Sequence, residues 1–254
     1  MIISSKTDKG IIRSNNEDSL LVIAPWHELA VRNGACLFVV ADGMGGQNAG
    51  EVASELAVSV AKEWFENTKI TEITPKLMGE LVEVVNEKVW AYAQANPETK
   101  GMGTTFSAIL FKDNKAVICH IGDSRIIRVR DNILLQLTND HSIVGEQVRL
   151  GRITPEQARV SPIRNILSKV LGARQFISPD IFETEIKVND KFVLCTDGLY
   201  SMLECSFFEK LIKETKVEEL ADLLIQQANL NGGKDNSTVI ALQITEFPIK
   251  IPST

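Results

Sequence analysis

Residues 38–46 constrain this chain more than any other stretch. An apolar run at residues 38–41, typical of a buried strand, leads to Asp42 and then to three glycines within four positions. Glycines allow the backbone to turn sharply and to bring its carbonyls close to a ligand. An aspartate beside an accessible carbonyl is an oxygen pair that suits a hard divalent cation. An ordinary turn from strand to helix, with Asp42 bonded to its own loop, would produce the same pattern.

Three further segments have the periodicity of amphipathic helices. Residues 52–64 carry an apolar side chain at every fourth position, which predicts a helix with one broad apolar face. Thr74 followed by Pro75 resembles an N-cap and a first helical turn, and predicts a second helix that ends near residue 96. A third helix is expected at about residues 217–230.

Strand-like runs make up much of the remainder. Three pairs of them flank short Asp/Asn turns at residues 113–114, 131–132 and 189–190. Such turns favour antiparallel hairpins over parallel crossovers. Other strands are expected at residues 2–8, 19–23 and 237–244, and a loop at 25–34. The residues themselves therefore predict antiparallel sheets covered by helices.

The chain shows no linker, repeat or low-complexity tract. One domain is predicted over residues 1–247, with a polar, partly helical segment at 139–175 and a short C-terminal tail at 248–254. A chain of 254 residues that is 44% hydrophobic and 24% charged can bury a full core.

Composition and charge exclude several classes of protein. A net charge of −6 without a basic run argues against binding to nucleic acid. The chain has neither a run of 18 apolar residues nor a leader-like start, so we expect a cytoplasmic protein that does not enter a membrane. The four cysteines lack CxxC spacing and are expected to be buried free thiols: Cys36, Cys119, Cys195 and Cys205.

Four aspartates share one local setting. Asp42, Asp123 and Asp197 each follow an apolar strand-like run, and Asp235 precedes the last such run after two glycines. Carboxylates gathered at one edge of a sheet repel each other, so either their pKa values rise or a cation lies among them. Oxygen ligands without His or Cys favour Mn²⁺ or Mg²⁺, and two such ions can activate a water beside a phosphoryl group. Each aspartate alone could equally be a turn residue.

Arg13 and the acids after it suggest an anion site. The planar guanidinium of Arg13 can bind two phosphate oxygens, although a plain surface arginine is the alternative. Glu17 and Asp18 could hydrogen-bond waters around a metal ion, or they could form a solvated turn. His120 is expected to pack in the core, and His141 to be structural.

Six motifs in this order resemble those of the protein phosphatase 2C family, the metal-dependent Ser/Thr phosphatases. Together they span about residues 10–240, and the compact length resembles the bacterial branch. The motifs are Arg13-Ser14-Asn15-Asn16-Glu17-Asp18, Asp42-Gly43-Met44-Gly45-Gly46, Gly103-Thr104-Thr105, Ile121-Gly122-Asp123-Ser124-Arg125, Thr196-Asp197-Gly198 and Lys234-Asp235-Asn236-Ser237-Thr238.

The resemblance implies an α+β fold of four layers (αββα): a central β-sandwich of two antiparallel sheets with helices on both outer faces. It implies two core ions, Mn²⁺ or Mg²⁺. Asp42 would bridge them, the Gly43 carbonyl would bind the first, and Asp197 and Asp235 would hold the second.

The same resemblance implies a weaker third ion held by Asp123 with Asp197, phosphate binding by Arg13, and a mobile flap at residues 139–175. The three glycines of this segment suit a part of the chain that must move.

Two positions depart from the family pattern. Met44 stands where some members have a histidine that resembles a general acid, and Ser161 precedes Pro162 where many bacterial relatives have histidine. A metal-bound water or another group must then protonate the leaving oxygen.

The expected reaction is hydrolysis of phosphoserine and phosphothreonine in proteins without a covalent enzyme intermediate. Phosphorylated proteins, with a cognate Ser/Thr kinase or its substrates, are the expected partners of a monomeric enzyme. The alternatives are a two-metal phosphoesterase acting on a non-protein substrate, including a nuclease, and a non-catalytic phospho-binding scaffold.

Overall fold

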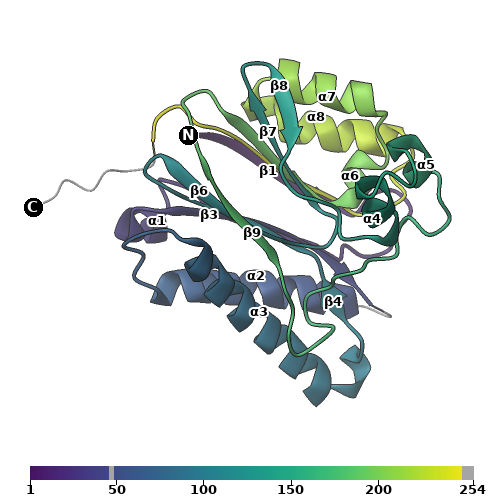
Figure 1. Cartoon of the computed structure of the whole chain (residues 1–254), viewed down its shortest axis with the longest axis horizontal. Helices are drawn as coiled ribbons and strands as arrows, with labels where there is room; N and C mark the ends of the chain where they lie inside the picture. Colours follow the sequence, from purple (N-terminus) through teal and green to yellow (C-terminus); the bar gives the residue numbers. More distant parts are fainter. Residues whose placement is uncertain (46–48, 248–254) are drawn as a thin grey trace, which may run out of the picture.

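Two antiparallel sheets are stacked face to face, and helices cover the outer face of each (Figure 1). The computed structural model describes residues 1–45 and 49–247. Gly46 of the glycine-rich motif and the predicted tail at 248–254 lie outside the described residues. The four-layer α+β architecture expected from the family resemblance is confirmed. The extent of a single domain over residues 1–247 stays a prediction.

The first sheet has five strands and contains both ends of the described fold. Its order is β1 (Ile2–Asp8), β11 (Ser237–Gln243), β10 (Lys191–Cys195), β7 (Arg125–Arg130) and β8 (Ile133–Gln136). The final strand therefore lies between the first strand and β10, in register from Ile2 opposite Gln243. Almost every residue of β11 is buried, because the second sheet covers one of its faces and helices cover the other.

The second sheet contains the apolar run at residues 38–41 and the aspartate that follows it, Asp42. Its order is β2 (Asp18–Ile23), β3 (Cys36–Met44), β5 (Phe106–Lys112), β6 (Lys115–Ile121) and β9 (Asp180–Glu185), with the short β4 (Gly103–Thr104) paired to the end of β3. Asp18 lies directly opposite Asp42 in this sheet.

Long helices pack on both sheets. The second sheet is covered by α2 (Ala49–Asn67) and α3 (Pro75–Ala95), and the first by α7 (Cys205–Glu214) and α8 (Val217–Leu230) (Figure 1). The predicted cap of α3 is confirmed, because the Thr74 side chain accepts a hydrogen bond from the Leu77 N–H. The shorter helices are α1 (Glu28–Asn33), η1 (Pro97–Thr99), α4 (Ile143–Arg149), α5 (Pro155–Arg159) and α6 (Asp197–Tyr200).

Aromatic side chains join the two sheets in the middle of the sandwich. Phe38 and Phe111 from the second sheet meet edge to face with ring centroids 5.8 Å apart, and Phe111 meets Phe192 of the first sheet at 5.3 Å. Edge-to-face pairs of this kind stabilise a core beyond the area that they bury.

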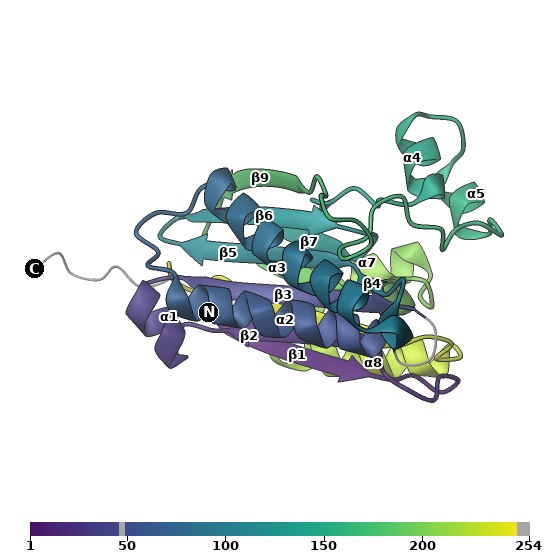
Figure 2. The ribbon, with the colours of Figure 1, turned by 90° about the horizontal axis from the view of Figure 1, so that it is seen from below.

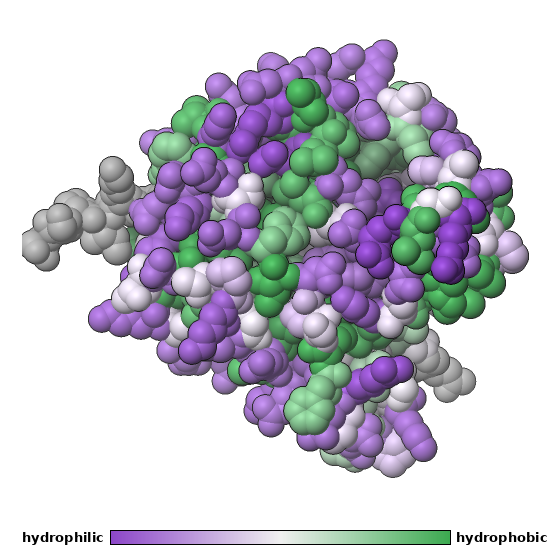
Figure 3. Space-filling model, in the orientation of Figure 1, coloured by the Kyte–Doolittle hydropathy of each residue, from purple (hydrophilic) through white to green (hydrophobic). Residues whose placement is uncertain are grey.

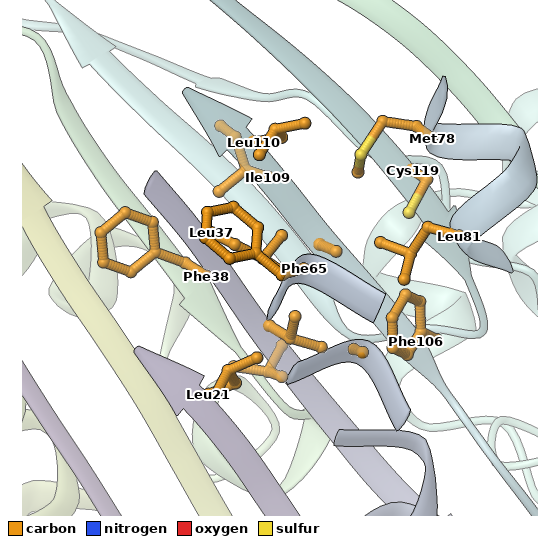
Figure 4. Packing of buried hydrophobic residues seen from close by; sticks show 14 of the residues in the cluster. Leu21, Leu37, Phe38, Phe65, Met78, Leu81, Phe106, Ile109, Leu110 and Cys119 are labelled. Carbon is orange, nitrogen blue, oxygen red and sulfur yellow. The ribbon is translucent and has the colours of Figure 1, made fainter. Parts of the chain in front are cut away.

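A second layer of core lies between β3 and the helices. Leu37, next to Phe38 in the chain, points to the opposite side of the sheet and packs near Phe65 of α2 (Figure 4). Met78 and Leu81 of α3 complete this layer. The alternation along β3 is the period of two that a strand requires.

Some expectations were wrong. The turn at residues 189–190 does not close a hairpin, since β9 and β10 belong to different sheets. Asp190 is instead buried against Arg130, which donates to it from Nε at 2.7 Å and from Nη2 at 2.6 Å, so this turn carries the chain from one sheet to the other. The other two predicted hairpins, β5–β6 and β7–β8, are confirmed.

Two further corrections concern the predicted loop and the cysteines. Residues 25–34 contain the short helix α1, capped by the His27 side chain. Cys205 is exposed at the start of α7, whereas Cys36, Cys119 and Cys195 are buried free thiols as expected.

The face of the molecule shown in Figure 3 is mostly hydrophilic. In Figure 3 hydrophobic residues are scattered among hydrophilic ones over the face shown. Among the described residues, no helix is both long enough and apolar enough to cross a bilayer.

Candidate active site

Four aspartates from distant parts of the chain meet in one pocket of about 250 Å³. Asp42 is carried by the end of β3, Asp123 by the turn after β6, Asp197 by the start of α6 and Asp235 by the turn before β11. The lining residues are Arg13, Glu17, Asp42, Gly43, Met44, Gly45, Thr105, Asp123, Asn165, Leu167, Asp197, Asp235 and Asn236. All the predicted site residues except Asp18 are therefore present in this lining.

Glycines permit the close approach of the segments that carry the acids. A Cβ atom on Gly43 would lie 2.0 Å from the Gly50 carbonyl oxygen, and one on Gly198 would lie 1.9 Å from that of Asn236. Since real Cβ atoms do not approach so closely, only glycine fits at either position. Asp197 is thereby held beside the turn that contains Asp235.

Threonines fix the backbone of Asp42. Thr105 Oγ1 accepts a hydrogen bond from the Asp42 N–H at 2.9 Å, and the Thr105 N–H donates to the Asp42 carbonyl at 2.8 Å. Thr104 Oγ1 donates to the same carbonyl at 3.0 Å. With its own backbone groups satisfied, Asp42 can present its carboxylate to the pocket.

Asp18 lies beneath the pocket rather than in its lining. It is buried next to Asp42, and its Oδ2 accepts a hydrogen bond from Thr196 Oγ1 at 2.8 Å. Its Oδ1 is buried without a hydrogen-bond partner in the described part of the chain. An unpaired buried acceptor is costly, which indicates that something outside the protein chain satisfies it.

The pocket raises the pKa values of its acids. Burial raises the pKa of Asp197 to about 6 and that of Asp18 to about 7, and neighbouring carboxylates add to both shifts. Burial and the carboxylates around them also raise the pKa values of Asp42 and Asp123 well above the ordinary range. These acids are therefore partly protonated near neutral pH unless positive charge is supplied from elsewhere.

Arg13 stands at the rim and supplies part of that charge. Its Nη2 donates to Asp235 Oδ2 at 2.8 Å, and the side chains of both residues remain partly exposed. The pairing orients the guanidinium along the pocket wall while most of its donors stay available for an anion.

The donor set fits a hard divalent cation. Every predicted ligand is an oxygen atom, and the side chains of Asp42 and Asp197 lie close enough for each to affect the pKa of the other. Within the described ranges, no three Asp, Glu, His or Cys side chains already form a ready-made metal site. Asp235 lines the pocket and also accepts a hydrogen bond from Arg13.

Several lining residues were not predicted. Asn236 holds three segments together: its Oδ1 accepts from the Glu17 N–H at 2.9 Å, and its Nδ2 donates to the carbonyls of Lys9 and Asn15. Asn236 and Thr105 both lie inside motifs quoted above, so the motifs could have identified them. Asn165 and Leu167 come from the flap, and only the tertiary structure shows that they reach the pocket.

The histidines are absent from the lining. His120 is fully buried, with Nδ1 2.8 Å from Ser107 Oγ and Nε2 3.0 Å from the Asn139 carbonyl oxygen, so its expected place in the core is confirmed. Met44 is 41% exposed at the rim and offers no proton.

Comparisons with known proteins agree with this geometry. A family model described as protein phosphatase 2C matches residues 14–232. Serine/threonine phosphatase stp of Listeria monocytogenes is 36% identical over 242 residues, which cover 94% of each chain. Serine/threonine protein phosphatase PstP of Mycobacterium tuberculosis is 34% identical over 96% of this chain and 45% of that protein.

Solved structures give the same result. The structure of serine/threonine phosphatase Stp1 from Staphylococcus aureus matches with a TM-score of 0.86 and 36% identity, covering 95% of this chain and 94% of that one. The structure of the PstP catalytic domain in complex with two manganese ions matches with a TM-score of 0.84 and 33% identity, covering 96% and 98%.

Proposed function

This chain belongs to the protein phosphatase 2C family, and we propose that it is a metal-dependent enzyme that removes the phosphoryl group from phosphoserine and phosphothreonine in proteins. The observation that carries the proposal is the meeting of Asp42, Asp123, Asp197 and Asp235 in one pocket, with Arg13 at its rim.

The acids of the pocket would hold the metal ions. Asp42, the Gly43 carbonyl, Asp197 and Asp235 would bind two Mn²⁺ or Mg²⁺ ions, and Asp123 with Asp197 would bind a weaker third. When bound, such ions lower the pKa of an attacking water and stabilise negative charge on a phosphoryl group. Cations among the acids would also remove the repulsion that now raises their pKa values.

The other residues of the pocket orient the substrate and the ligands. Arg13 would bind phosphoryl oxygens through guanidinium donors that Asp235 leaves free. Glu17 lines the wall beside Arg13, and the unpaired Oδ1 of Asp18 would accept a hydrogen bond from a water in the metal shell.

Protonation of the leaving oxygen does not depend on a histidine. Among the described residues that line the pocket there is none, and Met44 occupies the position at the rim. The proton would therefore come from a water bound in the pocket or from a group other than the carboxylates, because carboxylates that bind a cation are deprotonated.

The proposal extends to the oligomeric state, substrates and location of the enzyme. We propose that it is a cytoplasmic monomer that acts on the products of a cognate Ser/Thr kinase. The free, unpaired state of all four cysteines supports a reducing compartment.

A substrate panel and one aspartate substitution test the proposal. We expect Mn²⁺-dependent hydrolysis of a phosphothreonine peptide, and little or none of a phosphotyrosine peptide or an oligonucleotide. Asp42→Asn should abolish turnover, since it removes a ligand charge. Asp222→Asn is the matched control, because Asp222 pairs with Lys6 on an exposed face of α8 and should leave turnover unchanged. Full activity in excess EDTA would refute the proposal.

A further inference from the structure

His141 connects the flap to the turn that carries Asp123. Nδ1 of the His141 ring accepts a hydrogen bond from the Gly122 N–H at 3.2 Å, and the backbone N–H of His141 donates to the Gly122 carbonyl oxygen at 2.7 Å. The His141 carbonyl accepts a third bond from the Ser168 N–H at 2.8 Å, on the returning side of the flap. One buried residue therefore contacts both sides of the flap and the Gly122 turn.

The ring of His141 accepts a hydrogen bond at Nδ1. Because the Gly122 N–H can only donate, Nδ1 carries no proton, and burial lowers the pKa of His141. Nε2 lies 3.1 Å from Asp180 Oδ2, and this carboxylate opposes the lowering of the His141 pKa by burial.

The Gly122 turn has little freedom of its own. Gly122 has φ +104°, and a Cβ atom there would lie 2.5 Å from Thr105 Cγ2. The turn therefore packs closely against Thr105, which also bonds the backbone of Asp42. On the other side, the Asp123 carbonyl accepts a hydrogen bond from Tyr200 Oη at 3.1 Å. His141 and Tyr200 thus hold the backbone on both sides of the Asp123 side chain.

We propose that His141 is a positioning residue for catalysis, which fixes the Gly122–Asp123 backbone through Nδ1 so that the Asp123 carboxylate faces the pocket. Its role goes beyond packing, because it depends on one acceptor atom at one position. The inference rests on the proposed function, since it assigns His141 a part in presenting a proposed metal ligand.

Two substitutions separate the two ring nitrogens. In His141→Asn the side-chain oxygen lies near the position of Nδ1 and can still accept from Gly122. In His141→Gln the longer side chain reaches the position of Nε2 instead, and the Gly122 N–H loses its partner. Both variants remove the ring, and a role that depends only on filling its volume predicts that the larger glutamine is tolerated at least as well as asparagine, the opposite of the order expected here.

The direct readout is hydrogen exchange of the Gly122 amide in the metal-free protein. We expect exchange in His141→Gln to be about tenfold faster than in the wild type, as loss of one buried hydrogen bond implies, and exchange in His141→Asn to stay near the wild-type rate. Turnover should follow the same order: kcat at a fixed Mn²⁺ concentration falls in His141→Gln with little change in KM, and is largely rescued in His141→Asn.

Equal behaviour of the two variants in both measurements would overturn the inference. Tyr200→Phe gives a second test should His141→Gln fail to fold, since it removes the bond to the Asp123 carbonyl. It should raise the Mn²⁺ concentration needed for half-maximal turnover, and an unchanged requirement would count against positioning of Asp123. Absence of Mn²⁺-dependent turnover in the wild-type protein would refute the proposed function. The exchange rates of the Gly122 amide would still decide whether His141 holds the Gly122 backbone.

Discussion

Substitution of Gly198 by alanine tests how closely the acids of the pocket must approach. The new Cβ atom would lie 1.9 Å from the Asn236 carbonyl oxygen and 3.0 Å from the Cβ of Asp235. Restoring an ordinary contact of 3.4 Å requires α6 and the turn before β11 to move apart by about 1.5 Å. That movement separates Asp197 from Asp235, the pair proposed to hold one ion.

A displacement of this size should be severe for catalysis and moderate for stability. Misplacement of reacting groups by about 1 Å can cost on the order of 100-fold in rate, so kcat/KM for a phosphothreonine peptide should fall by at least about 100-fold. Overpacking of a tight contact typically costs about 1–3 kcal/mol, which urea unfolding can measure. Most Gly198→Ala protein should therefore remain folded.

The matched control is Gly79→Ala on α3. A Cβ atom there would lie 3.7 Å from Ile181 Cδ1, which is an ordinary contact, and alanine favours a helix over glycine by roughly 1 kcal/mol. This variant should be slightly more stable than the wild type and equally active. Near-normal, Mn²⁺-dependent turnover by a folded Gly198→Ala protein would refute the reasoning about the pocket.

Three other predictions concern stability and reactivity. Asp190→Ala removes the buried carboxylate that pairs with Arg130 and leaves the guanidinium only the Glu185 carbonyl, and should lower the free energy of unfolding by about 3 kcal/mol; a loss below about 1 kcal/mol in urea titration would contradict this. Burial raises the pKa of Asp18 from 3.8 to about 7, so the folded metal-free protein binds more protons than the unfolded chain, and its melting temperature should fall as pH rises from about 4 to 7. A melting temperature that rises across this range would argue against the shift. Ellman's reagent should label Cys205 alone in the native protein, because burial raises the pKa values of the other three thiols to about 12; rapid labelling of a second thiol would show that the fold differs.

Local patterns predict the elements whose signal lies within the element itself. The helix expected at about 217–230 is α8 with the same bounds, because a long apolar stripe has few alternative conformations to satisfy it. The cap at Thr74 was equally visible. In contrast, the sequence patterns do not predict α7. A short helix is marginal alone, and α7 depends on packing by residues such as Phe208 and Ile212.

Long-range pairing decides what local patterns cannot. The turn at Asn189 has positive φ and looks like a hairpin turn, yet β9 pairs with β6 through neighbours such as Ile118 and Phe182. Which sheet a strand joins depends on contacts far away in the chain, and a turn signal carries no information about them.

The acids of the site could be predicted because each lies in a recognisable local pattern, at the end of a strand and next to a glycine or a small polar residue. The residues that orient those acids do not lie in such a pattern. Asn165 lines the pocket only because the flap folds back over it, and His141 bonds Gly122 across 19 positions of sequence.

The flap is the region where movement would matter most. Its helices α4 and α5 stand away from the sandwich (Figure 2), and Val160 next to α5 is 80% exposed. Its stem is fixed by two backbone hydrogen bonds, from the Ile143 N–H to the Ile166 carbonyl and from the Ser168 N–H to the His141 carbonyl. A mobile tip on a fixed stem is the behaviour we predict, with the His141 contact to Gly122 preserved throughout.

Anomalous diffraction at the manganese edge, from crystals grown with Mn²⁺, tests the central claim most directly. We expect two strong peaks in the pocket, both within coordination distance of Asp42, one reached also by the Gly43 carbonyl and the other by Asp197 and Asp235. A pocket without a peak beside Asp42 at saturating Mn²⁺, with the four carboxylates pointing apart, would contradict the account.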